Sequence, residues 1–188
     1  MSQTQLPFDP IAEARRQWDE RWDAGAWMAA STSVMRVQQI VLSRVDAALR
    51  DLGLNFARYE VLVLLHFSRR GSLPMGKMGV RLMIHPTSVT NLVDRLEEAG
   101  LVRRVPHPSD RRTTLAAITP AGRRLVERAT TRVTEVQLGL QGLNERELDQ
   151  LSALLRKVRL NAGDYAPAAT GTSVPPTSST SDRRRAVG

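Results

Sequence analysis

Proline divides this chain of 188 residues into two long stretches that can form helices and a short centre that must turn often. No proline occurs in residues 11–73 or 121–166, whereas five of the ten prolines occur in residues 74–120. A proline inside a helix removes a backbone hydrogen bond and clashes with the preceding turn. The sequence therefore predicts a mainly α-helical fold with a turn-rich segment at its centre.

The composition excludes several classes of protein. The length suits one domain with extensions, and 41% hydrophobic and 24% charged residues are typical of a soluble globular protein. Cysteine is absent, which excludes disulfides, zinc–thiolate sites and thiol redox sensing. No apolar run of about 18 residues and no signal-peptide pattern occurs, so we expect a cytoplasmic protein outside any membrane. The motifs G-x-S-x-G and H-E-x-x-H and the P-loop are absent too, so we expect no enzyme, no metal and no cofactor.

Positive charge is concentrated in one block of the chain. The net charge of +8 comes from 27 basic and 19 acidic residues, and 25 of the basic residues are arginine. Residues 58–112 carry ten basic and five acidic side chains, which is +5 of the +8. Codon bias in a GC-rich genome would spread arginine and leave acids to balance it everywhere. Since arginine binds phosphate and guanine bidentately, the local excess predicts a basic surface for a polyanion.

Apolar residues recur at helical spacing along most of the chain. Helices are predicted over 9–24, 27–52, 56–70, 74–82 and 86–99, from Thr119 to about 140, and from Asn144 onward. Residues 101–105 and 113–118 are predicted to form a two-stranded hairpin with a basic tip between them. The tail, residues 164–188, is rich in Pro, Ser and Thr, which predicts disorder.

The helix that starts at Pro86 differs from the others because short polar side chains cover its outer face. Val89, Leu92, Val93 and Leu96 form its predicted buried stripe, which leaves hydroxyl and amide side chains exposed. A helix, a short helix, this hydroxyl-rich helix and a basic hairpin are, in that order, typical of a winged helix-turn-helix. Such a helix fits the major groove of duplex DNA, and the hairpin can reach the adjacent minor groove. An aromatic content of only 4% argues against RNA or single strands as the polyanion.

The segment 86–124 resembles the multiple-antibiotic-resistance regulator (MarR) family of bacterial transcription factors. That family's wing has the pattern D-x-R, an apolar strand, then L/I-T-x-x-G; here Asp110 and Arg112 precede the strand, and Thr119 and Gly122 follow it. The resemblance implies a homodimeric regulator of double-stranded DNA, usually a repressor that occludes a promoter and responds to a small ligand. It implies an N-terminal extension (1–26), a dimerisation helix (27–54), a winged helix-turn-helix (55–119), C-terminal dimerisation helices (120–163) and the tail (164–188).

The resemblance also implies which residues touch DNA. Arg112 resembles the wing arginine that enters the minor groove, and Asp110 resembles the acid that orients it through an ion pair. The expected DNA-contacting residues are Pro86, Thr87, Ser88, Thr90, Asn91, Arg95, Arg104, Asp110, Arg111 and Arg112. Three alternatives stay open. Thr87 and Ser88 can cap the helix, and Arg95 can pair with Glu98 or Asp94 along it. Arg103 and Arg104 alternate across their strand, so only one of them is expected to face DNA. A non-specific architectural DNA-binding protein would share the charge and the wing, and this is the alternative function.

Three tryptophans, Trp18, Trp22 and Trp27, lie within ten residues near the N-terminus. They either pack the extra helix or roof an effector pocket; the first reading is favoured. For the second, the polar groups to test are Arg36, His66 and Arg81, which would suit an acidic aromatic or carboxylate ligand. The urate-responsive branch of the family uses an Asp and an Arg seven residues apart. Here Glu60 is followed by Phe67, so urate is not supported.

Overall fold

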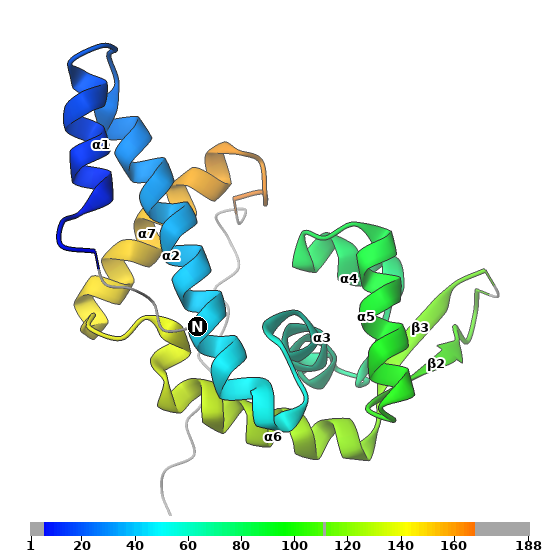
Figure 1. The fold of residues 1–188 in the computed structure, drawn as a ribbon. Helices are drawn as coiled ribbons and strands as arrows, with labels where there is room; N and C mark the ends of the chain where they lie inside the picture. The colour runs from blue at the N-terminus through cyan, green and yellow to red at the C-terminus, as the bar shows by residue number, and fades with distance from the viewer. Residues whose placement is uncertain (1–5, 111, 168–188) are drawn as a thin grey trace, which may run out of the picture. The chain divides into compact units, whose positions relative to one another are not determined.

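The computed structural model describes residues 6–110 and 112–167 of the chain. The chain divides into two compact units, with the boundary between Gln141 and Gly142. Helices α1 to α6 and the sheet belong to the first unit, and α7 belongs to the second; each is described by itself (Figure 1). Most of the tail that is predicted to be disordered, residues 168–188, lies outside the described residues.

Helices α1 (Pro10–Asp19) and α2 (Gly25–Leu49) form a helical hairpin at the start of the chain (Figure 1). The predicted first helix extends to residue 24, but the observed one ends at Asp19 because a tight turn follows. Trp18 closes this turn by donating its indole N–H to the carbonyl of Asp23 at 3.0 Å. A Cβ at Gly25 would lie 2.0 Å from an Asp19 carboxylate oxygen, so the exposed Asp19 side chain would have to move.

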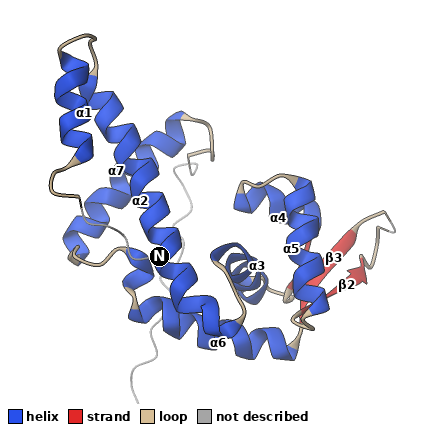
Figure 2. Cartoon of the chain, in the orientation of Figure 1, coloured by secondary structure: helices blue, strands red, loops and turns tan. Residues whose placement is uncertain are grey.

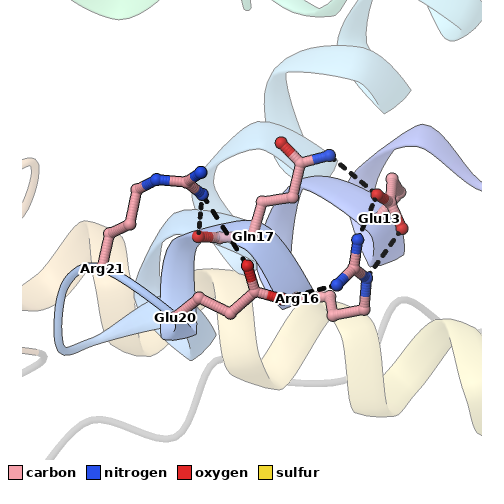
Figure 3. A network of polar contacts seen from close by, with 5 residues as sticks. All are labelled: Glu13, Arg16, Gln17, Glu20 and Arg21. Carbon is pink, nitrogen blue, oxygen red and sulfur yellow. Dashed lines mark hydrogen bonds and ion pairs between the residues drawn. The ribbon is translucent and has the colours of Figure 1, made fainter.

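Charge pairs on its own surface stabilise α1, which buries none of its residues within the chain. The Arg16 guanidinium donates to Glu13 at 2.8 Å and to Glu20 at 2.5 Å, and Gln17 also donates to Glu13 at 2.7 Å (Figure 3). The Arg16 guanidinium lowers the pKa of the Glu13 carboxyl to about 2. Pairs three and four residues apart stabilise an exposed helix, and here they take the place of a buried face.

The hydrophobic core of the first unit surrounds α3 (Phe56–Phe67), whose N-cap is Asn55. Around it lie the C-terminal part of α2, α4 (Met75–Leu82), α5 (Pro86–Glu98) and α6 (Pro120–Glu135). The largest fully buried side chains are Leu49, Leu62, Leu65, Met78, Leu96, Val45, Val61, Val89, Val93, Val102, Val126 and Val133. Three of the four residues of the stripe predicted for α5, Val89, Val93 and Leu96, are buried in this core, and the fourth, Leu92, is partly buried against it.

Three antiparallel strands form the sheet, in the order β1-β3-β2. Figure 2 shows β2 and β3 side by side. The predicted hairpin is confirmed as β2 (Val102–Pro106) and β3 (Thr114–Ile118), with Val102 opposite Ile118. The third strand, β1 (Ser72–Pro74), is missing from the sequence prediction. This strand has three residues, ends in proline and shows no alternation of polar and apolar residues, so no sequence pattern predicts it. The predicted mainly α fold with a winged helix-turn-helix is confirmed.

The sixth predicted helix ends earlier than expected. Helix α6 stops at Glu135, and a 3-10 turn (Gln137–Gly139) follows, with Leu138 in the left-handed region at φ 47°. Gly139 lies so close to α2 that a Cβ there would be 2.9 Å from the Cα of Val41. In the second unit, α7 (Glu145–Asn161) begins with the predicted capping box between Asn144 and Glu147.

Candidate nucleic-acid interface

Helix α5 presents a short polar face at its N-terminus. Thr87, Ser88, Thr90 and Asn91 are exposed, while Val89, Val93 and Leu96 enter the core. Pro86 occupies the first helical position, and His85 caps the helix by accepting the N–H of Thr87 on its Nδ1 at 3.2 Å. The structure therefore brings the predicted reading residues of this helix together on one surface.

The turn before α5 is held tightly against the preceding helix. Met83 ends α4 in the left-handed conformation, at φ 54°. A Cβ added to Gly79 would lie 3.2 Å from the Ile84 carbonyl and 3.4 Å from a methyl of Val89. Gly79 therefore permits the close approach of α4 and α5 that a helix-turn-helix needs.

The wing tip is ordered by a carboxylate in an unexpected way. The sequence predicts an ion pair from Asp110 to the Arg112 guanidinium. In the structure the Asp110 carboxylate instead accepts the backbone N–H of Arg112 at 3.0 Å and the hydroxyl of Thr113 at 2.7 Å. These two bonds, that from the Thr113 hydroxyl first, lower the pKa of Asp110. Asp110 thus shapes the turn and leaves the exposed Arg112 side chain outside any ion pair among the described residues; Arg111 lies outside them.

Arg104 links the wing to α5 through ion pairs. Its guanidinium donates to Asp94 at 2.5 Å and also to Glu97, both on α5, and its backbone N–H donates to Glu97 at 2.8 Å. These bonds lower the pKa of Glu97, and the bond to Asp94 is the largest cause of the raised pKa of Arg104. The DNA contact expected of Arg104 stays a prediction, since these ion pairs occupy two of the five N–H groups of its guanidinium. Arg103 is exposed on the same strand.

Arg95 adopts the intrahelical alternative. Its guanidinium pairs with Glu98 at 3.1 Å, and both side chains are largely exposed, at 72% and 65%. Such a pair holds the guanidinium weakly, so it can still turn towards a phosphate. Thr90 is also exposed, and its hydroxyl donates to the Pro86 carbonyl at 3.2 Å within the helix.

Comparison with known proteins identifies the architecture. Residues 54–114 match the sequence model of the MarR family. The crystal structure of Sco5413, a MarR family transcriptional regulator from Streptomyces coelicolor, is 51% identical, with a TM-score of 0.70 over 76% of this chain and 99% of that one. The chain belongs to the MarR family. Its relatives are transcriptional regulators rather than enzymes, as the sequence predicts.

Two further members of the MarR fold were solved with bound partners. Sco3205, a MarR family transcriptional regulator from S. coelicolor, was crystallised with DNA; it is 28% identical, with a TM-score of 0.66 over 79% of this chain and 92% of that one. CouR from Rhodococcus jostii RHA1 was solved with p-coumaroyl-CoA; it is 33% identical, with a TM-score of 0.62 over 69% of this chain and 90% of that one. This chain is thus similar both to a DNA-bound and to a ligand-bound protein.

Of the six residues proposed for an effector site in this MarR chain, Trp18 and Trp22 are in contact with each other. Trp18 closes the α1–α2 turn and contacts Trp22 at 5.0 Å between ring centroids, and Trp27 is 79% exposed. Arg36 and Arg81 are exposed on α2 and α4. Two cavities, one beside α1 and one between α3 and α5, are lined by none of the six.

His66 is the last of these six residues. It is proposed only as a polar group for an effector pocket, and its Nδ1 is buried with no hydrogen-bond partner among the described residues. Within the described part of the chain no group of three or more metal-binding side chains exists, and no described helix is apolar and long enough to cross a membrane.

Sequence reasoning missed three residues that shape this surface. They are His85, which caps α5, and Asp94 and Glu97, which anchor the wing through Arg104. One signal was available, because two acids three residues apart on a helix directly precede a strand that carries two arginines. Which of the two arginines Asp94 and Glu97 bind depends on the side of the strand from which each arginine side chain projects. The sequence does not show which side of the strand faces α5.

Proposed function

We propose that this chain is a homodimeric, ligand-responsive repressor that reads a pseudo-palindromic operator. One observation carries the proposal: the polar face of α5 and the basic wing are tied into one surface through Arg104. Exposed Thr87 and Asn91 would face base edges in the major groove, and Arg112 would enter the minor groove. The DNA complex of Sco3205 supports the same use of this architecture here.

The proposal of a dimer rests on α2, whose apolar stripe is only half buried. Val45 and Leu49 lie in the core at 1% and 0% exposure, whereas Val34 and Val37, on the same stripe, are 52% and 43% exposed. In the second unit, α7 exposes Leu154 and Val158 on one face at 63% and 67%. Apolar surface of this extent on two helices supports burial against a second copy of the chain.

A two-fold dimer explains how the protein would select an operator. Two copies of α5 would lie about one turn of DNA apart, roughly 34 Å, so they would read two half-sites related by symmetry. Binding over a promoter would occlude polymerase, and the site of action would be the cytoplasm. A ligand would relieve repression by preferring a conformation that does not bind DNA.

Selection of bound duplexes from random DNA tests this function against the architectural alternative. We expect enrichment of an inverted repeat with half-site centres about 10 base pairs apart. We also expect affinity at least about 10³-fold above that for unrelated DNA at the same salt concentration. Binding without an enriched repeat, and with a salt dependence equal for all sequences, would instead establish an architectural protein.

A further inference from the structure

A cavity of about 340 Å³ lies between α3 and the recognition helix α5. Its walls are Ala57, Glu60, Ile84, Ser88, Asn91 and Leu92. The volume is at the small end of the range for sites that bind organic molecules. Since Ser88 and Asn91 belong both to this wall and to the proposed reading face of α5, anything bound here touches the DNA-binding helix directly.

The chemistry of the walls is specific. Ala57, Ile84 and Leu92 supply apolar surface, while Ser88 and Asn91 supply neutral hydrogen-bonding groups. Glu60 is the only charged residue of the lining. No cation forms an ion pair with it among the described residues, and burial raises the pKa of its carboxyl with no charge to offset it. A half-buried carboxylate without a partner is stabilised most by a cation that also donates hydrogen bonds to it.

We propose that this cavity binds a small organic amine, whose ammonium group pairs with Glu60 and whose apolar body packs between α3 and α5. The amine would donate to Glu60 and engage Ser88 or Asn91, so these side chains would no longer be available to base edges. The inference deepens the proposed ligand response and rests on it. It also replaces the expectation of an acidic ligand, because a second carboxylate beside Glu60 would bring two negative charges together in a partly dry site.

Three ligands of similar shape and different charge test the proposal. They are 2-phenylethylamine, the neutral 2-phenylethanol and the acidic 3-phenylpropanoate. Calorimetry on the full chain measures binding, and fluorescence anisotropy of a labelled operator measures release. We expect only the amine to bind appreciably and, at saturation, to weaken operator binding by about 5- to 150-fold. By reciprocity, saturating operator should weaken amine binding by the same factor. Equal binding of the acid or the alcohol would overturn the proposal.

The variant Glu60→Gln keeps the shape of the side chain and removes its charge. We expect amine affinity to fall about tenfold or more, while operator affinity without amine stays within about twofold of the wild type. The matched control is Asp51→Asn, an exposed acid on the 3-10 turn after α2, which should leave both affinities unchanged. Thermal unfolding checks that Glu60→Gln folds, and we expect no loss of stability because an unpaired carboxylate is removed.

The two proposals fail in different ways. If the wild type selects an operator and the amine neither binds nor releases it, the amine site is wrong and the DNA-binding function stands. Unchanged amine affinity in Glu60→Gln would likewise overturn the site. If no operator is selected but calorimetry shows amine binding that depends on Glu60, the cavity stands and the repressor function is wrong.

Discussion

The backbone N–H of Arg104 on the first wing strand donates to the Glu97 carboxylate of the recognition helix at 2.8 Å, and its guanidinium engages the other oxygen of the same carboxylate. The guanidinium also reaches Asp94, one helical turn earlier. Three bonds thus join the two parts of the chain that are proposed to enter neighbouring grooves. Their spacing is fixed before DNA arrives, which removes an ordering cost from binding.

Replacing Arg104 by methionine should weaken operator binding whether or not Arg104 touches DNA. The variant releases the wing and leaves two carboxylates facing the DNA, so we expect a loss of about threefold to tenfold. The salt dependence of binding separates this role from a phosphate contact. Loss of a phosphate contact lowers the slope of log K against log salt by about one. Loss of the ion pairs between the wing and α5 leaves the slope unchanged. A slope lower by one would show that Arg104 contacts a phosphate.

Arg112→Ala tests the wing directly. The side chain is exposed and lies in no described ion pair, so its removal should cost about 1–3 kcal/mol of operator binding and should leave the dimer intact. Anisotropy titrations at fixed salt measure the affinity, and light scattering measures the mass. Arg132→Ala is the control, because Arg132 is an exposed arginine of α6 that pairs with Glu135. Equal affinity in Arg112→Ala and the wild type would contradict the wing mechanism.

The turn at the wing tip should depend on pH in a defined direction. The pKa of Asp110 is lowered from its ordinary value of 3.8, since the ionised carboxylate accepts bonds from Thr113 and Arg112. The turn is therefore fully stabilised above pH 3.8 and loses this stabilisation as the pH falls through the lowered pKa. We expect the amide shifts of Arg112 and Thr113 in NMR spectra to stay constant from pH 8 to about 5. A transition of both amides centred at or above the ordinary value would contradict this assignment.

Local patterns in the sequence predict the elements that form the site, but not the contacts between them. The stripe of Val89, Val93 and Leu96 predicts α5, because one face of that helix must enter the core. The turn-forming tip between two apolar segments predicts the wing hairpin, although three consecutive residues of β3 are buried. The partners of Arg104 and of Asp110 depend on strand facing and on turn geometry. The end of α6 depends on how closely Gly139 approaches Val41 of α2. These features arise from packing between segments far apart in the chain. The periodicity of a single segment does not predict such contacts.

Gly122, the last residue of the wing pattern, should tolerate no side chain. A Cβ there would lie 2.2 Å from the Leu101 carbonyl and 2.9 Å from a side-chain carbon of Ile118. Gly122→Ala therefore forces the start of α6 away from the sheet, and we expect a loss of about 2–4 kcal/mol in the free energy of unfolding. Gly76→Ala is the matched control, since a Cβ on this helical glycine meets nothing within 4 Å. It should be neutral or stabilise by up to about 1 kcal/mol. Chemical denaturation measures both; equal stabilities would refute the packing argument.

Val34→Asp should separate the two copies of the chain without unfolding either. Val34 is 52% exposed on α2, so a charge there costs little in the isolated chain but is costly once that surface is covered by a partner. Burial of a valine is worth about 1.5–3 kcal/mol, so the dissociation constant of the dimer should rise at least about tenfold. Sedimentation across a concentration series measures this constant. Val80→Asp is the control, because Val80 is an exposed valine of α4, at 84%, outside the proposed interface. Operator affinity should fall with dimer stability in Val34→Asp, because a monomer binds one half-site; an unchanged dimer would exclude this face of α2 from the interface.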